Sequence, residues 1–291
     1  MAPKHLMRFS MTQAPSFLNT LLGNQAVKNH LQQMSSLPSA MLFSGPAGVG
    51  KATFAKAFAQ ARLGRAGHPD LILLEPEGKS QMHPIENIRN LIQRLAIPPY
   101  EAPITIVIID SADRMLPYAA NALLKTLEEP PTYAHLILTS SHSDRLLPTI
   151  RSRCQVLPFQ PLKRDDLHAF FTQRNASQNL DALITLSQGS LSRAEKLLSG
   201  DLNLEPIFDY LENNKPLTGD AEELLPLLQY WYRDRHLLAA GANPSQLFYK
   251  EHLDRLKAHV SRPLPSLESL HLKLADALEA THRGIKLSAL T

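Results

Sequence analysis

The sequence contains a single cysteine and no long run of apolar residues. Because Cys154 is the only cysteine among 291 residues, an intrachain disulfide and a zinc site built from several cysteines are excluded. No segment approaches the ~18 consecutive apolar residues that a membrane-spanning helix requires. The first residues also lack the apolar core of a secretory signal peptide. These absences predict a soluble protein of a reducing compartment, and we expect it to be cytoplasmic, without membrane contact.

Strong charge of one sign is absent as well. Lysine and arginine number 30 against 27 aspartates and glutamates, which gives a formal net charge of +3. This balance permits contact with DNA, but it lacks the strong basic footprint of a protein that binds nucleic acid on its own. The twelve histidines show no close spacing with acids or with the cysteine, so we predict no metal site of the zinc kind.

Short apolar segments alternate with amphipathic segments through the first 160 residues. This periodicity predicts strands and helices in turn, with strands at 41–43, 71–74, 104–109, 136–138 and 156–159 and helices at 20–34, 51–63, 85–95 and 118–127. The alternation favours an α/β domain with a mostly parallel sheet and helices on both faces. No strand is predicted after Pro161, so the remainder is expected to be helical.

A glycine-rich segment lies between a predicted strand and a predicted helix, as in phosphate-binding loops. Its sequence is Gly45-Pro-Ala-Gly48-Val-Gly50-Lys51. The small residues allow successive backbone N–H groups to turn toward phosphate oxygens. The next helix adds the positive end of its dipole, and Lys51 supplies a mobile cation for the outer phosphates. The alternative, a plain glycine-rich turn with an exposed lysine, is disfavoured by the flanking strand and helix.

Two positions lack the groups that a hydrolytic site of this kind needs. Ala52 follows the lysine, where an active loop carries serine or threonine to bind magnesium. Thr53 lies about 100° further round the helix and should point away from the metal. Asp110 ends the 104–109 strand at the sheet edge where α/β proteins bind ligands, although a helix-capping role is the alternative. Ser111 then replaces the glutamate that would activate water, so we expect no ATP hydrolysis by this chain.

Two further motifs make the chain resemble the clamp-loader subunits of bacterial DNA polymerase III. Residues 122–131 have the sequence Ala-Leu-Leu-Lys-Thr-Leu-Glu-Glu-Pro-Pro, and residues 152–154 are Ser-Arg-Cys. Residues 23–25, Gly-Asn-Gln, resemble the adenine-side box of that family. Residues 68–71, His-Pro-Asp-Leu, resemble the sequence that follows the zinc module in relatives, but the module with its four cysteines is missing. The resemblance covers residues 22–198 and is weaker beyond.

Within this family the chain is most similar to the delta-prime type. Motor subunits of the gamma or tau type keep an acidic pair at the strand end and a serine or threonine after the lysine, and this chain has neither. The resemblance implies an AAA+ P-loop nucleoside triphosphatase-like domain at 1–160, a small helical lid domain at 161–203 and an all-helical C-terminal collar domain at 204–291. It also implies a five-subunit ring with gamma/tau and delta subunits, which places the sliding clamp (beta) on primer-template DNA during replication.

The resemblance also assigns candidate site residues. Arg153 matches the arginine finger that reaches the ATP of the neighbouring subunit, because a guanidinium is always charged and can bridge two phosphate oxygens. A surface arginine in a loop is the alternative. Arg193 resembles the lid-domain sensor that contacts phosphate, and Ser140 occupies the sensor-1 location, where we expect a structural role. The candidate nucleotide-binding residues are Gly45, Gly48, Gly50, Lys51, Ala52, Thr53, Asp110, Ser140 and Arg193.

We expect that no cofactor is required and that no zinc is bound. Any binding of ATP or ADP should be weak, and both an empty and a weakly occupied loop are compatible with these residues. Three other functions stay open. A catalytically active gamma/tau-type ATPase is disfavoured by Ala52 and Ser111, a small-molecule kinase by the lack of a phosphate-acceptor pocket in the helical part, and an independent DNA-binding protein by the modest charge.

Overall fold

The computed structural model describes residues 18, 20–78, 82–174, 180–199, 204–219, 221–282 and 285. Contacts divide the chain into two compact units. The first consists of Met1–Asn175 with Gln188–Ser192, and the second of Ala176–Ser187 with Arg193–Thr291. Residues of the expected lid domain, 161–203, contribute to both units, so the division into three domains stays a prediction.

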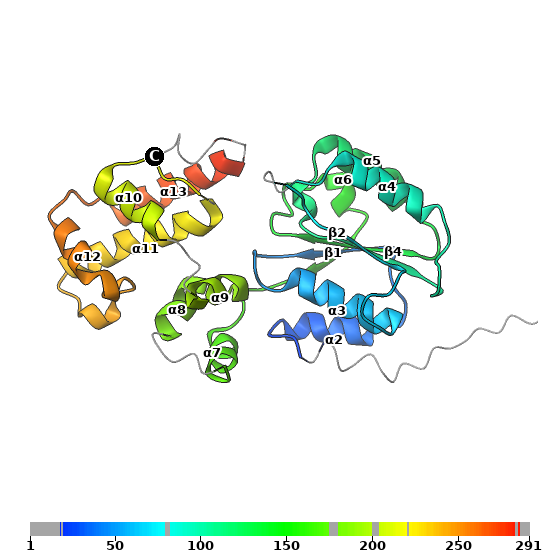
Figure 1. Cartoon of the computed structure of the whole chain (residues 1–291), viewed down its shortest axis with the longest axis horizontal. Coiled ribbons are helices and arrows are strands. Elements are labelled where there is room, and N and C mark those ends of the chain that lie inside the picture. Colours follow the sequence, from blue (N-terminus) through cyan, green and yellow to red (C-terminus); the bar gives the residue numbers. More distant parts are fainter. Residues whose placement is uncertain are drawn as a thin grey trace, which may run out of the picture. The chain divides into compact units, whose positions relative to one another are not determined.

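A five-stranded sheet forms the centre of the first unit (Figure 1). The strand order is β2-β3-β4-β1-β5, and every pairing is parallel. The strands are β1 (Ala40–Ser44), β2 (Leu71–Leu74), β3 (Thr105–Ile109), β4 (Ala134–Ser140) and β5 (Gln155–Pro158). Parallel neighbours need crossover connections, which place helices over the faces of the sheet. The expected α/β fold with a parallel sheet is thereby confirmed.

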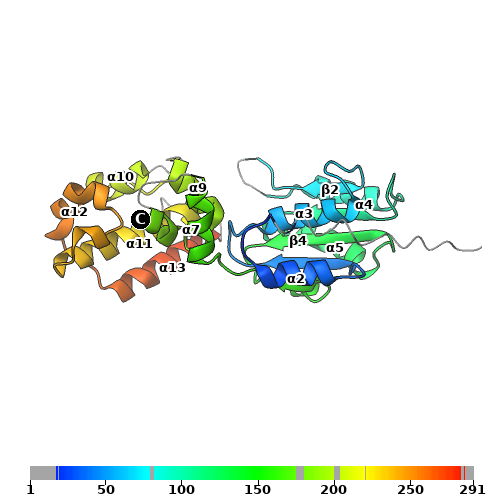
Figure 2. The same cartoon turned by 90° about the horizontal axis from the view of Figure 1, so that it is seen from below.

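Two pairs of helices cover the two faces of this sheet (Figure 1, Figure 2). One face carries α2 (Gln25–Gln33) and α3 (Lys51–Leu63), and the other α4 (Ile85–Leu95) and α5 (Pro117–Glu128). Alternate residues of a strand point to opposite faces, so β1 contributes to two separate cores. Phe43 packs on the side of α3, whereas Leu42 packs on the side of α4.

The remaining helices of the described residues follow β4 and β5. They are α6 (Pro148–Arg151), α7 (Arg164–Thr172), α8 (Leu180–Ser187), α9 (Leu191–Ser199), α10 (Glu205–Asn213), α11 (Ala221–Ala239), α12 (Leu253–Val260) and α13 (Leu267–His282). Short 3-10 turns lie at Ala112–Arg114, Pro244–Gln246 and Lys250–His252. As expected, the described part of the chain beyond Pro161 contains helices and no strand. No helix of the described residues is long and apolar enough to cross a bilayer.

An aromatic core stabilises the second unit around α11. Trp231 lies at its centre, with ring centroids 5.6 Å from Phe208 and 5.1 Å from Tyr249. Buried Asp234 accepts the backbone N–H of Tyr249 at 2.7 Å and pairs with Arg233 at 2.9 Å. Because both oxygens of this buried carboxylate have donors, the polar group is compatible with the apolar surroundings.

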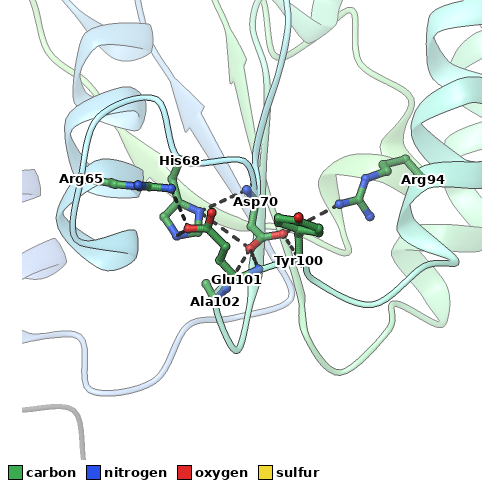
Figure 3. A network of polar contacts seen from close by, with 7 residues as sticks. All are labelled: Arg65, His68, Asp70, Arg94, Tyr100, Glu101 and Ala102. Carbon is green, nitrogen blue, oxygen red and sulfur yellow. Dashed lines mark hydrogen bonds and ion pairs between the residues drawn. The ribbon is translucent and has the colours of Figure 1, made fainter.

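Asp70 fixes the loop that leads into β3, at the sheet edge opposite the carboxyl ends of the strands (Figure 3). Its fully buried carboxylate accepts three consecutive backbone N–H groups, at 2.5 Å from Tyr100, 2.8 Å from Glu101 and 2.8 Å from Ala102. Arg94 and His68 lie 3.8 Å from its oxygens. Burial alone would raise the pKa of Asp70, but the backbone donors and His68 outweigh it and hold the pKa below its ordinary value. The His-Pro-Asp motif therefore has a structural role: through Asp70 it holds the loop before β3 in place.

Candidate functional site

The glycine-rich loop joins β1 to α3, as the sequence predicts. Gly48 and Gly50 have φ angles of 72° and 94°, which residues with a side chain rarely adopt. At Gly45 a Cβ would lie 2.2 Å from the carbonyl oxygen of Phe159, just after β5. The loop therefore needs glycine both for its turns and for its close approach to the neighbouring strand.

The side chain of Lys51 is folded back onto this loop. It is only 7% exposed, and its Nζ donates to the carbonyl oxygens of Gly45 and Pro46 at 2.7 Å each. Nζ also donates to Ser141 Oγ at 3.1 Å. A phosphate that binds Lys51 has to compete with these acceptors, so the lysine is less available than the sequence suggests.

The start of α9 covers the middle of the loop. Ser192 donates its backbone N–H to the carbonyl oxygen of Gly48 at 3.3 Å. A Cβ at Gly48 would lie 2.0 Å from Oγ of Ser190, which is buried. Sequence reasoning did not predict this contact, because it joins segments that are far apart in the chain.

The two residues after Lys51 differ in their surroundings. Ala52 is half-buried and carries only a methyl group, whereas Thr53 is exposed. The rotation of about 100° per helical residue separates the two side chains, as expected. Within the described ranges, no group of three or more His, Cys, Asp or Glu side chains could hold a metal ion.

Asp110 lies directly after β3, at the carboxyl edge of the sheet, and is bonded to the adjacent strand. Thr139 in β4 donates its hydroxyl hydrogen to Asp110 Oδ1 at 2.5 Å, and its oxygen accepts the backbone N–H of Ser111 at 2.9 Å. The carbonyl oxygen of Asp110 accepts from His83 Nε2 at 2.7 Å. The strand end is therefore fixed by neighbours, while Ser111 brings a hydroxyl where a hydrolytic site needs a carboxylate.

Ser140 ends β4 and is fully buried, and its Oγ accepts the backbone N–H of His142 at 3.2 Å. The next residue, Ser141, contacts the loop through Lys51 and donates its backbone N–H to Asp113 Oδ1 at 3.2 Å. Sequence reasoning named Ser140 and missed Ser141. Its position directly after the strand, at the edge that carries the loop, was the available signal.

Asn24 ties the start of α2 to the chain that leaves β5. Its Oδ1 accepts the backbone N–H of Gln160 at 2.8 Å, and its Nδ2 donates to the carbonyl oxygen of Gln160 at 3.2 Å.

Arg193 is half-buried on α9 and belongs to the second unit. A contact between Arg193 and phosphate stays a prediction.

Arg153 lies on an exposed turn between α6 and β5. Its Nη2 is 2.6 Å from Glu128 Oε1 at the end of α5, and its Nη1 donates to the carbonyl oxygen of Thr149 at 2.9 Å. The Arg153 side chain is 34% exposed. Cys154, the next residue, is buried, and burial raises the pKa of its thiol to about 11. The two motifs at 122–131 and 152–154 therefore meet at the surface of the first unit.

Residues 23–163 match the family model described as DNA polymerase III, delta subunit. DNA polymerase III subunit delta' of Pseudomonas aeruginosa is 31% identical over 229 residues, covering 71% of this chain and 70% of that protein. The same subunit of Bacillus subtilis is 27% identical over 294 residues, covering 87% and 88%. The replication factor C small subunit of Methanocella arvoryzae is 30% identical over 231 residues, covering 73% and 70%.

Several Methanococcus replication factor C small subunits also match, and the chain spans 61% of their length. The two delta' relatives are covered over 70% and 88% of their own length. The family model begins at Gly23 and extends past Arg153, so it includes the glycine-rich loop and both surface motifs. The chain therefore belongs to the delta-prime family of DNA polymerase III clamp-loader subunits.

Proposed function

We propose that this chain is the stator of a bacterial DNA polymerase III clamp loader. It does not hydrolyse ATP itself, and it supplies Arg153 to the ATP bound by a neighbouring subunit. Its partners are gamma/tau and delta subunits in a five-subunit ring, which loads the sliding clamp on primer-template DNA in the cytoplasm.

The contrast between two places on the same chain carries this proposal. At the chain's own site, Nζ of Lys51 donates to the carbonyl oxygens of the loop. Ala52 has no hydroxyl to bind magnesium, and Ser111, just after β3, has no carboxylate to act as a base. Arg153, in contrast, presents a guanidinium on an exposed turn. An arginine that meets the charge developing on a partner's γ-phosphate can accelerate hydrolysis by roughly 1,000- to 100,000-fold.

The test uses a reconstituted loader with Arg153→Ala or Arg153→Lys. We expect both variants to fold and assemble, because substitution of an exposed residue costs little stability. The DNA-dependent, clamp-stimulated ATPase rate should fall in part, since other sites in the ring keep their own fingers. Arg153→Lys should fail almost as badly, because an ammonium cannot present the fork of guanidinium donors.

Arg151→Ala provides the matched control, since Arg151 is an exposed arginine at the end of α6, two residues before Arg153. This variant should keep the wild-type rate. If both Arg153 variants match the wild type in an intact ring, Arg153 is not a finger and the stator mechanism is wrong.

A further inference from the structure

Glu128 and Arg153 come from the two motifs, 122–131 and 152–154, that the chain shares with clamp-loader subunits, yet only Arg153 has a role in the proposed function. The motifs are separated in sequence, and a direct ion pair joins them, with Arg153 Nη2 2.6 Å from Glu128 Oε1. Both side chains are partly exposed, at 34% for Arg153 and 49% for Glu128.

Packing brings these two residues together. Leu127 and Cys154, their immediate chain neighbours, are both buried in the core between the sheet and α4–α5, together with Ile150 of α6. The end of α5 and the turn after α6 are thereby anchored next to each other. Glu128 and Arg153 are the adjoining residues at the rim of this anchored core, so their pairing does not depend on a flexible segment.

The contacts of Arg153 leave part of its guanidinium available. Nη2 donates to Glu128, and Nη1 donates to the carbonyl oxygen of Thr149 at 2.9 Å and approaches Ser152 Oγ at 3.5 Å. A guanidinium has five N–H donors. Within the described residues these three contacts therefore leave roughly two donors for a phosphate group.

We propose that Glu128 is a positioning residue for Arg153, an inference that rests on the proposed function. Its carboxylate and the Thr149 carbonyl hold the guanidinium in one orientation on the surface before a neighbouring subunit arrives. A long side chain that is ordered in advance loses less rotamer freedom when it meets the transition state. An exposed ion pair contributes little to stability. Replacing Glu128 should therefore disturb the orientation of Arg153 and leave the stability of the fold nearly unchanged.

The first experiment measures the Arg153-dependent ATPase rate, which is the wild-type rate minus the Arg153→Ala rate, in the reconstituted loader. Glu128→Ala should lower the Arg153-dependent rate about 10-fold. The loss should appear in kcat with little change in KM, because a misplaced catalytic group weakens binding of the transition state. Glu128→Gln keeps an acceptor oxygen for Arg153 and should therefore retain more of the Arg153-dependent rate than Glu128→Ala does. Glu129→Gln removes the same charge from the next exposed residue and should have no effect.

The double variants separate positioning from a general structural role. In the Arg153→Ala background, Glu128→Ala should change nothing further, since the group that it positions is absent. An equal loss in both backgrounds would overturn the proposal. If Arg153→Ala lowers the rate while Glu128→Ala matches the wild type, the positioning role is wrong and the proposed function stands.

A second measurement does not depend on activity. Nitrogen-15 relaxation of the Arg153 Nε–H group in the free chain reports how well this side chain is ordered. We expect clear ordering in the wild type and in Glu129→Gln, and loss of order in Glu128→Ala. If the order is the same in all three, Glu128 does not hold Arg153. If Arg153→Ala has no effect on ATPase while the order is lost as expected, the pairing is real and the finger role is what fails.

Discussion

Thr139 donates its hydroxyl hydrogen to Oδ1 of Asp110 at 2.5 Å, between two adjacent parallel strands. The hydroxyl oxygen also accepts the backbone N–H of Ser111 at 2.9 Å. Thr139 is 1% exposed, so water cannot replace these bonds if the hydroxyl is removed. One side chain thus fixes both residues at the strand end where a hydrolytic relative would carry its acids.

Thr139→Val should lower the free energy of unfolding of the first unit. Valine has nearly the same shape, but it leaves the Ser111 N–H and one Asp110 oxygen without this partner, which should cost about 1–3 kcal/mol. Urea denaturation followed by circular dichroism measures the loss. Thr53→Val, at an exposed position, should stay within about 0.5 kcal/mol of the wild type. Equal urea midpoints of unfolding for Thr139→Val and Thr53→Val would contradict the structural role of Thr139.

The isolated chain should not turn over ATP. Ser111 has no carboxylate to activate water, and Ala52 has no side-chain oxygen to bind magnesium. A coupled assay of phosphate release on the pure chain, with and without DNA, tests this. Turnover near the ~1 to 100 per second of competent phosphoryl-transfer enzymes would favour an active motor subunit instead.

Binding of ATP or ADP should be weak and only slightly dependent on magnesium. The loop amides remain, but Lys51 must first leave the carbonyl oxygens of Gly45 and Pro46, and the usual hydroxyl ligand of magnesium is missing at Ala52. Titration with a fluorescent ATP analogue, with magnesium and with a chelator, measures both effects. Tight binding that the chelator abolishes would show that the loop is a working nucleotide site.

Asp70→Asn should destabilise the first unit by about 3 kcal/mol at neutral pH, because an amide cannot accept three N–H groups as a carboxylate does. The pKa of Asp70 is lower in the folded chain than its ordinary value. Its stabilising effect is therefore complete above the unfolded pKa of about 3.9 and is lost as the pH falls through the folded value.

The difference in unfolding free energy between wild type and Asp70→Asn should thus shrink below about pH 4. Asp165→Asn is the control, since Asp165 is exposed in the first turn of α7 and should contribute less than about 1 kcal/mol. A difference between wild type and Asp70→Asn that is the same at low and neutral pH would mean that the Asp70 charge is not what binds the loop.

Cys154 should resist thiol reagents in the folded chain. Burial raises the pKa of its thiol to about 11, so at pH 8 the reactive thiolate is on the order of 100-fold scarcer than for a free cysteine. Reaction with a chromogenic disulfide, followed with and without guanidinium chloride, measures the difference. Rapid labelling of the native chain would show that the turn after α6 opens readily.

The regular elements of the first unit could be predicted closely from apolar periodicity. The predicted segments 51–63, 71–74 and 85–95 coincide with α3, β2 and α4 in the structure. The helix expected from residue 20 instead begins at Gln25. Gly23 and Asn24 have positive φ angles of 61° and 48°, and the Asn24 side chain bonds to Gln160. This contact between distant segments overrides the local helical pattern.

The candidate site was predictable where it depends on local sequence and not where it depends on pairing between strands. The loop, Lys51 and Asp110 follow from motif and periodicity. The bond from Thr139 to Asp110 requires the register of β3 with β4, and the ion pair of Arg153 with Glu128 requires α5 and α6 to share one core. Neither register nor packing can be derived from composition or spacing in a single sequence.

The position of β1 in the sheet has a consequence for how the chain acquires its structure. β1 pairs with β4 and β5 on its two sides, and both follow it by about 100 residues, a separation that slows folding because a long loop must close first. At a synthesis rate of ~5–20 residues per second, β1 precedes its partners by about 5–20 s on the ribosome. β2 and β3 are much closer in sequence and can pair earlier. The glycine-rich loop, which depends on β1, therefore acquires its shape only after most of the first unit has been synthesised.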